Sequence, residues 1–393
     1  MMALPYDPGA RAPYLDSDFA AGEYDRRFAA VRLAMAAEGL DALIVFSGPG
    51  TYANVRYLTN FEPVFGSAFV VIRANGDVTV TADGMLHAEP MHSMVWNCRV
   101  ADVRCTPGAI YGGPPDEVAT LAADAVGVAA RVGLAGSGAL PFALHAALAK
   151  RLPNLVAADR VLAAVRLIKS ADEIAYMETS GAIADAAFDA VFAALKPGVL
   201  ETEVAAAAVD AMTRRGAIES FRTCVVGGRL AGLKHAYPRE RRLEAGEMVF
   251  LDLGASYRGY ASDTSRTGVV GGNAKGDAAA LLAVSEDLYA AGLEQMRPGR
   301  TIDDVAQRLI KVVKGTRWEK DFYASGFGHG IGLDLFEAPG GLIQGSSAVL
   351  QPGMTVAYEP MVVVESLGTG VIEDTVLITE TGYRLLTNSR RQF

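Results

Sequence analysis

Four acidic residues and one histidine lie in stretches of sequence that are otherwise typical of buried β-strands. Asp252 is the charged residue of the segment FLDLG, and Asp263 follows it after 11 positions in YASDT. His329 lies within GHGIG, Glu359 within VAYEP and Glu373 within VIEDT. Carboxylates that share a buried site repel one another unless a cation or a shared proton compensates their charge. The set therefore predicts a site for divalent metal ions.

The spacing also predicts how two of these carboxylates come together. A strand through Asp252, a tight return at residues 257–260 (YRGY) and a second strand would set Asp252 and Asp263 side by side. A lone Asp in a strand lies more often at an edge or a turn, but two in facing strands favour a shared ion. The glycines flanking His329 are expected to let its imidazole and the backbone approach an ion closely. Three or more oxygen donors with one imidazole suit manganese, cobalt, zinc or ferrous iron, and two such ions can activate a water molecule.

The order Asp-x10-Asp, His, Glu, Glu, in the contexts DLG, SDTSRT, GHGIGLD, YEP and IED, resembles the pita-bread family. That family includes aminopeptidase P, prolidase, methionine aminopeptidase and creatinase. The resemblance implies an α+β fold, with a pita-bread catalytic domain preceded by a smaller α/β creatinase-type domain. It also implies that two divalent ions (Mn, Co, Zn or Fe) are bound by Asp252, Asp263, His329, Glu359 and Glu373. Asp263 and Glu373 would bridge the ions, while Glu359 would also act as general base beside a water that bridges them.

The resemblance implies roles for two residues outside the ligand set. His235 precedes Asp252 by 17 positions, where peptidase members carry a histidine that lines the substrate pocket and helps to transfer protons. The stretch YANVRYLT at residues 52–59 is similar to the creatinase-type leading domain, and on this basis we assign Tyr57 to substrate binding. A homodimer is implied as well, with the leading domain of one subunit bordering the other's site.

Two positions depart from the peptidase pattern. Peptidase members carry a second histidine seven residues after the ligand histidine, and Phe336 stands there in this chain. Proline-specific members tend to carry an arginine two residues before the last glutamate, where this chain has Val371. We expect Phe336 and Val371 to make the substrate pocket more apolar. The resemblance also implies that the missing histidine would donate to the substrate carbonyl, and losing one such oxyanion donor typically slows a hydrolase by about 10²- to 10³-fold.

The elements that must position these residues fall into two halves, which we assign as domains at residues 1–165 and 166–393. The first half reads as α/β, with a helix over residues 23–39 and a hairpin over 68–83 that turns at Asn75-Gly76. The second half reads as α+β with a mainly antiparallel sheet, and Ser170 with Glu173 fits a capping box that opens its first helix. Its helices are expected over residues 170–195, 201–216, 274–297 and 301–314.

Composition narrows the class of protein. The 393 residues carry a formal net charge of −9, with no basic stripe, so a nucleic-acid partner is not expected. The three cysteines (Cys98, Cys105 and Cys224) lack the close spacing of a zinc knuckle or redox pair and are expected to be buried thiols. The amino terminus lacks the pattern of a signal peptide, and glycines, Arg131 and Pro141 interrupt the most apolar stretch. We therefore expect a cytoplasmic enzyme without a membrane span.

Three functions remain open at this point. The first is a dinuclear metallohydrolase that cleaves an amide bond of a short peptide, with proline or another imino acid as the preferred residue. The second is a non-peptidase hydrolase or lyase for a small molecule on the same scaffold, similar to creatinase, ectoine hydrolase or DMSP lyase. The third is an inactive binding protein, which the complete ligand set disfavours.

Overall fold

The computed structural model describes residues 15–63, 66–82, 97–106, 114–232 and 236–391. The chain divides into two compact units, Met1–Arg166 and Leu167–Phe393. Each unit has a hydrophobic core of its own.

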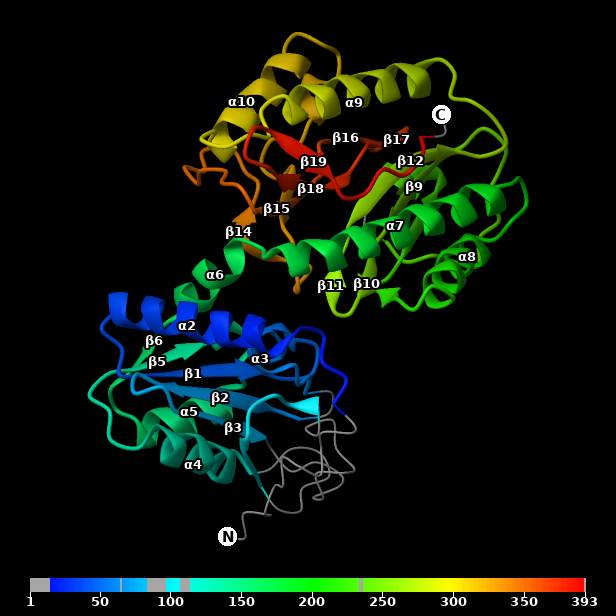
Figure 1. Cartoon of the computed structure of the whole chain (residues 1–393). Helices are drawn as coiled ribbons and strands as arrows, with labels where there is room; N and C mark the ends of the chain where they lie inside the picture. The colour runs from blue at the N-terminus through cyan, green and yellow to red at the C-terminus, as the bar shows by residue number, and fades with distance from the viewer. Residues whose placement is uncertain (1–14, 64–65, 83–96, 107–113, 233–235, 392–393) are drawn as a thin grey trace. The chain divides into compact units, whose positions relative to one another are not determined.

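The amino-terminal unit is built on a mixed β-sheet with the strand order β4-β3-β2-β1-β5-β6 (Figure 1). Strand β1 is antiparallel to β2 and parallel to β5. The expected hairpin joins β2 to β3, where Gly76 has a φ of 103° and the Asn75 side chain accepts a hydrogen bond from the backbone N–H of Asp77. The strands are β1 (Ala42–Ser47), β2 (Ala68–Arg73), β3 (Val78–Ala82), β4 (Asp102–Cys105), β5 (Val132–Ala135) and β6 (Leu155–Ala157). The helices are α2 (Ala21–Ala37), α3 (Ala53–Thr59), α4 (Pro115–Val126), α5 (Phe142–Arg151) and α6 (Asp159–Leu167).

Helix α2 corresponds to the helix expected over residues 23–39. The chain leaves it through Gly39, whose φ of 64° suits a residue without a Cβ atom. Its buried face carries Arg27, whose guanidinium carbon lies 4.4 Å from the centroid of the Phe19 ring and 4.1 Å from that of Tyr57. Arg27 also donates a 2.7 Å hydrogen bond to the Tyr57 carbonyl. Tyr57 is thus a buried packing partner of Arg27 in this unit, and its role in substrate binding stays a prediction.

The carboxy-terminal unit contains antiparallel sheets flanked by two pairs of helices (Figure 1). Every strand pair among its described residues is antiparallel, as expected. The helices are α7 (Ala171–Ala194), α8 (Glu201–Thr213), α9 (Asp277–Leu293) and α10 (Ile302–Val313). The strands are β7 (Ile218–Glu219), β8 (Cys224–Gly227), β9 (Met248–Leu253), β10 (Ala255–Tyr257), β11 (Tyr260–Ala261), β12 (Thr264–Val269), β13 (Gly328–Gly330), β14 (Glu337–Gly341), β15 (Thr355–Tyr358), β16 (Met361–Val364), β17 (Gly368–Val371), β18 (Asp374–Ile378) and β19 (Tyr383–Leu385).

Each helix pair covers its own group of strands. Helices α7 and α8 pack on β8 and β9 through a cluster that includes Phe188 and Leu251, while α9 and α10 pack on β15 and β18 through one that includes Leu288 and Val376. The capping box predicted at the start of α7 is confirmed, because Ser170 accepts from the N–H of Glu173 and the Glu173 side chain accepts from the N–H of Ser170. The strands of this unit are therefore packed against two separate helix pairs.

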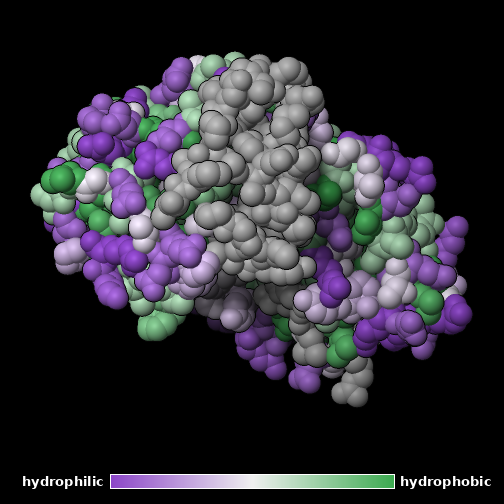
Figure 2. Space-filling view, turned by 90° about the horizontal axis from the view of Figure 1, so that it is seen from below, coloured by the Kyte–Doolittle hydropathy of each residue, from purple (hydrophilic) through white to green (hydrophobic). Residues whose placement is uncertain are grey.

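The surface of the described residues mixes both kinds of side chain. In Figure 2, hydrophilic and hydrophobic residues are interspersed over the coloured part of the face shown. No helix in the described part of the chain has the length and apolar character needed to cross a membrane. Cys98 and Cys224 are buried and Cys105 is half-buried.

Candidate metal centre

The first two carboxylates come from one hairpin, as the sequence predicted. Strands β9 and β12 are antiparallel, and Asp252 lies opposite Ser265. Between them β10 and β11 pair Tyr257 with Tyr260. The two central residues of this turn, Arg258 and Gly259, both have positive φ angles, of 51° and 85°. This is the signature of a type I′ turn, whose twist matches that of the flanking strands.

The other three residues come from a second ladder. His329 lies in the middle of β13 and pairs with Ala357 on β15. Tyr358 on β15 pairs with Asp374 on β18, so Glu359 and Glu373 adjoin the same end of that ladder. Antiparallel partners lie about 5 Å apart, which places these two carboxylates beside each other.

Backbone and side-chain contacts join the hairpin to the ladder. The N–H of Glu373 donates to the carbonyl of Ser265 at 3.0 Å. The Thr375 hydroxyl accepts from the N–H of Asp263 and donates to the carbonyl of the same residue, both at 3.0 Å. Residues more than a hundred positions apart are thus held in a fixed register.

One pocket of about 320 Å³ receives all five predicted ligands. The ligand atoms of Asp263, His329 and Glu373 lie within 4.8 Å of one another, and Asp252 and Glu359 line the same pocket. Its described lining residues are Phe221, Arg222, Cys224, Tyr237, Asp252, Asp263, His329, Leu335, Phe336, Glu359 and Glu373.

Ser265 is a site residue that sequence reasoning missed. Its hydroxyl oxygen lies 3.0 Å from Oδ1 of Asp252 and 2.6 Å from Oε2 of Glu373. A hydroxyl carries one hydrogen, so it can donate to one of these carboxylates at a time. The signal was available, because Ser265 follows Asp263 by two positions and alternate residues of a strand share a face.

The electrostatics of the pocket fit a divalent cation. Burial, together with the charges of Asp263, Glu359 and Asp252, raises the pKa of Glu373 well above its ordinary value. Burial disfavours protonation of His329, but its hydrogen bond to Asp263 and the charge of that residue outweigh burial and raise its pKa. A divalent cation would relieve the repulsion among the carboxylates.

The orientation of His329 suits a ligand. Its Nδ1 lies 3.1 Å from the carbonyl of Gly330, and its Nε2 lies 3.3 Å from Oδ2 of Asp263. Since a carbonyl only accepts, Nδ1 carries a hydrogen, so Nε2 is the atom that faces Asp263 and that an ion would bind in place of a proton.

The flanking glycines leave room for neighbouring backbone, and their expected role in the approach to an ion stays a prediction. A Cβ atom on Gly328 would lie 2.0 Å from the carbonyl oxygen of Ala357, and one on Gly330 would lie 2.3 Å from that of Ala338. The glycines therefore allow neighbouring backbone to approach β13 closely, and they act on His329 by fixing the position of its strand.

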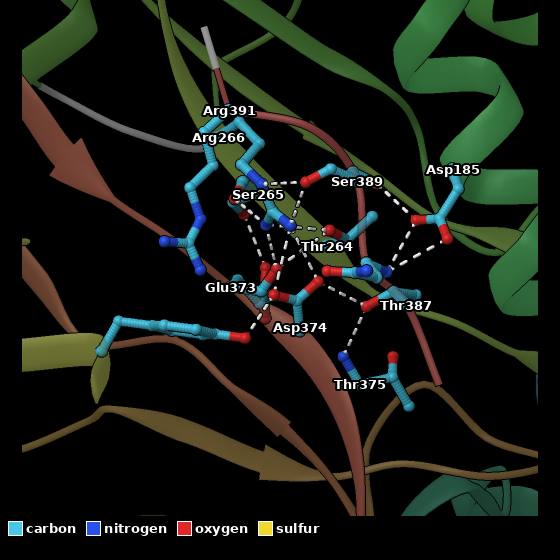
Figure 3. A network of polar contacts seen from close by, with 12 residues as sticks. Asp185, Thr264, Ser265, Arg266, Glu373, Asp374, Thr375, Thr387, Ser389 and Arg391 are labelled. Carbon is cyan, nitrogen blue, oxygen red and sulfur yellow. Dashed lines mark hydrogen bonds and ion pairs between the residues drawn. The ribbon is translucent and has the colours of Figure 1, made fainter. Parts of the chain in front are cut away.

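Behind Glu373 lies a buried ionic network, shown in Figure 3. Arg266 pairs with Asp374 at 2.9 Å, and each side chain is 1% exposed. Arg266 also donates to the backbone carbonyls of Glu373 and Ser389, and Asp374 accepts from the hydroxyls of Tyr289 and Thr387. The network thus anchors the backbone of Glu373 and the residue that follows it.

The residues expected to contact substrate differ in their placement. Phe336 lines the pocket, is 68% exposed, and its ring centroid lies 4.1 Å from that of His329. Val371 is fully buried in a cluster with Phe250 and Met361, and it is not among the described lining residues. His235 lies outside the described residues.

Cys224 lies in the pocket wall opposite Asp252 in the β8–β9 ladder. Burial, and then the charges of Asp252 and Asp263, raise the pKa of its thiol to about 12. At neutral pH the side chain is therefore an uncharged thiol, as expected for a buried cysteine.

Known proteins share both units. The family model for metallopeptidase family M24 matches residues 175–380, and that for the Creatinase/Prolidase N-terminal domain matches residues 27–168. The chain is 29% identical over 357 residues to an uncharacterized peptidase of Bacillus subtilis, YqhT, which covers 90% of this chain and 95% of that protein. It is 36% identical over 238 residues to an Xaa-Pro dipeptidase of Pyrococcus furiosus, which covers 60% of this chain and 67% of that protein.

A solved structure agrees over nearly the whole chain. The Xaa-Pro dipeptidase from Bacillus anthracis has a TM-score of 0.81 and 26% sequence identity, and the match covers 94% of this chain and 99% of that one. The expected α+β architecture with a creatinase-type leading domain is thereby confirmed, as is a metal-dependent hydrolase. The chain belongs to metallopeptidase family M24.

Proposed function

We propose that this protein is a dipeptidase that binds two divalent ions and hydrolyses short peptides of the Xaa-Pro class. The observation that carries the proposal is the convergence of four carboxylates and His329 on one pocket. Similarity to Xaa-Pro dipeptidases supports the substrate class.

The ligand set supports Mn, Co, Zn or Fe as the bound ions, since carboxylates and one imidazole suit all four. We assign Asp263 and Glu373 to both ions, and Asp252, His329 and Glu359 to complete their coordination. Bound ions of this kind supply Lewis acidity and lower the pKa of a water molecule.

The protein's own residues orient the reaction. Glu359 lines the pocket beside the cluster and is assigned to accept a proton from the attacking water. The Ser265 hydroxyl lies within hydrogen-bonding distance of the carboxylates of Asp252 and Glu373 and orients the one to which it donates. The family resemblance assigns His235 to substrate orientation and proton transfer, so His235→Ala is expected to lower kcat by about 10²-fold or more at unchanged metal content. Unchanged turnover in this variant would remove His235 from the assignment.

The test combines metal analysis with a substrate panel. The purified protein should contain close to two divalent ions per chain, and it should cleave Xaa-Pro dipeptides. Glu373→Ala and Asp252→Ala should lose both metal and activity. Full activity in a strong chelator, or metal-loaded protein without any dipeptidase activity, would refute the proposal.

One observation favours a second candidate, a hydrolase or lyase acting on a compact, partly apolar small molecule. The exposed ring of Phe336 lies against His329, where peptidase relatives carry a hydrogen-bond donor. Panels of small amides and osmolytes should therefore accompany the dipeptides. Turnover of such a compound above that of every dipeptide would favour this alternative.

A further inference from the structure

The pocket is lined by acids, yet a short peptide brings a carboxylate of its own. Asp252, Asp263, Glu359 and Glu373 are assigned to the metal ions, which would balance their charge, and their carboxylates offer that group no hydrogen-bond donor. Among the described lining residues, Arg222 is the side chain with a permanent positive charge. Its position therefore decides where an anionic end of the substrate can lie.

Arg222 is close in sequence to the metal-binding strands. It precedes Cys224 by two residues, and Cys224 pairs with Asp252 across β8 and β9. Two residues span at most about 7 Å along a chain. The carboxylate of a dipeptide in turn lies one residue, roughly 3.5 Å, from its scissile carbonyl. A guanidinium at this position suits a carboxylate held one residue away from the reacting bond.

The loop that carries Arg222 is braced on both sides. The N–H of Ser220 donates to the carbonyl of Gly254 at 2.9 Å, and its hydroxyl donates to the carbonyl of Ser262 at 3.0 Å. On the other side, the N–H of Thr223 donates to the carboxylate of Glu219 at 2.9 Å. Because Ser262 adjoins Asp263, the loop is fixed to the segment that provides a metal ligand.

The guanidinium itself is held by an aromatic ring. Its central carbon lies 4.3 Å from the ring centroid of Tyr237, which also lines the pocket. Stacking on a ring occupies the face of a guanidinium, whereas its N–H groups project from the edge. Arg222 is exposed, so this edge is accessible to a ligand.

We propose that Arg222 binds the terminal carboxylate of a short peptide and thereby selects dipeptides over amidated or longer peptides. The inference rests on the proposed peptidase function and names the part of the substrate that the enzyme recognises. A charge-assisted hydrogen bond from a fixed guanidinium is expected to change kcat/KM by about 10- to 100-fold.

The test compares an Xaa-Pro dipeptide with its carboxy-terminal amide, using metal-loaded enzyme. The wild-type protein should prefer the free acid. Arg222→Ala should lower kcat/KM for the acid by about 10- to 100-fold, leave kcat/KM for the amide within about threefold, and keep its metal. Arg222→Lys should retain part of the preference, because an ammonium keeps the charge without the planar fork.

Arg317→Ala is the matched control. Arg317 also lies over an aromatic ring, with its guanidinium carbon 4.2 Å from the ring centroid of Trp318, but it is not among the described residues of the site pocket. This variant should keep the preference. Equal kcat/KM for acid and amide in the wild type, or an equal loss on both in Arg222→Ala, would overturn the inference alone. Cleavage of neither peptide by metal-loaded enzyme would overturn the proposed function as well.

Discussion

The Arg266–Asp374 pair behind Glu373 offers a quantitative test of how the site is supported. Both side chains are 1% exposed and lie 2.9 Å apart. Arg266→Met leaves the Asp374 carboxylate buried without its cation, and Asp374→Asn leaves the guanidinium without its anion. Removing one partner of a buried ion pair typically costs about 3–5 kcal/mol. This is a large share of a typical domain's stability of about 5–15 kcal/mol.

The double variant should cost much less than the sum of the two single changes, because neither charge is then left uncompensated. We expect a coupling free energy of about 3 kcal/mol between the two positions. Metal affinity should fall in Arg266→Met, since Arg266 also donates to the carbonyl of Glu373.

Urea unfolding followed by tryptophan fluorescence measures these free energies. Trp318 is buried in the core of the carboxy-terminal unit, and replacing Trp96 with phenylalanine leaves it as the single reporter. Arg384→Ala serves as the control, because Arg384 forms an exposed ion pair with Glu178 and should cost no more than about 1 kcal/mol. Single variants as mild as this control, or costs that simply add, would refute the reasoning.

Further predictions concern Phe336, Val371, acid stability and metal. Phe336→His should raise dipeptidase activity, because it places a hydrogen-bond donor beside His329; unchanged kinetics would contradict this. Val371→Arg should lower the melting temperature, because it buries a charge; an unchanged melting temperature would contradict this. Glu23→Gln should reduce the free energy of unfolding at pH 7 but not in acid. Burial opposes ionisation of Glu23, yet Arg26 and Arg27 outweigh burial and lower the pKa of its carboxyl. The contribution of Glu23 to the free energy of unfolding is therefore present above pH 4.5 and is lost as pH falls through the lowered pKa. An equal loss of stability in acid would show that these ion pairs are not the cause. Chelation at neutral pH should lower the melting temperature of the carboxy-terminal unit, and adding ions at 100 times their Kd should restore about 2.7 kcal/mol; melting curves that do not respond to metal would count against the site.

Local patterns in the sequence were sufficient for the hairpin of Asp252 and Asp263. The turn at Arg258-Gly259 is a short-range signal, and β9 before it is a short apolar run that is buried along its whole length. The capping box of α7 is equally local. The ion pair between Arg266 and Asp374 joins residues 108 positions apart, and no local pattern in either segment predicts it.

Val371 shows where alternation fails. The family resemblance placed Val371 in the substrate pocket, and residues 371 and 373 would share a face in a continuous strand. The structure instead ends β17 at Val371 and begins β18 at Asp374. The break in the strand turns Val371 into a core cluster with Met361, while Glu373 faces the pocket. A single sequence does not show that the strand is interrupted between Val371 and Asp374.

The division of the ligands between a hairpin and a distant ladder has a consequence for how the chain acquires its metal. Asp252 and Asp263 can meet as soon as a local two-strand turn closes, but His329, Glu359 and Glu373 follow Asp263 by 66, 96 and 110 positions. Bringing them in requires the closure of long loops, which is slow relative to hairpin formation. A chain that has folded only locally therefore offers two of the five predicted ligands and is expected to retain an ion weakly. Stable metal binding is therefore expected only in molecules in which the segments that carry His329, Glu359 and Glu373 have packed against the hairpin.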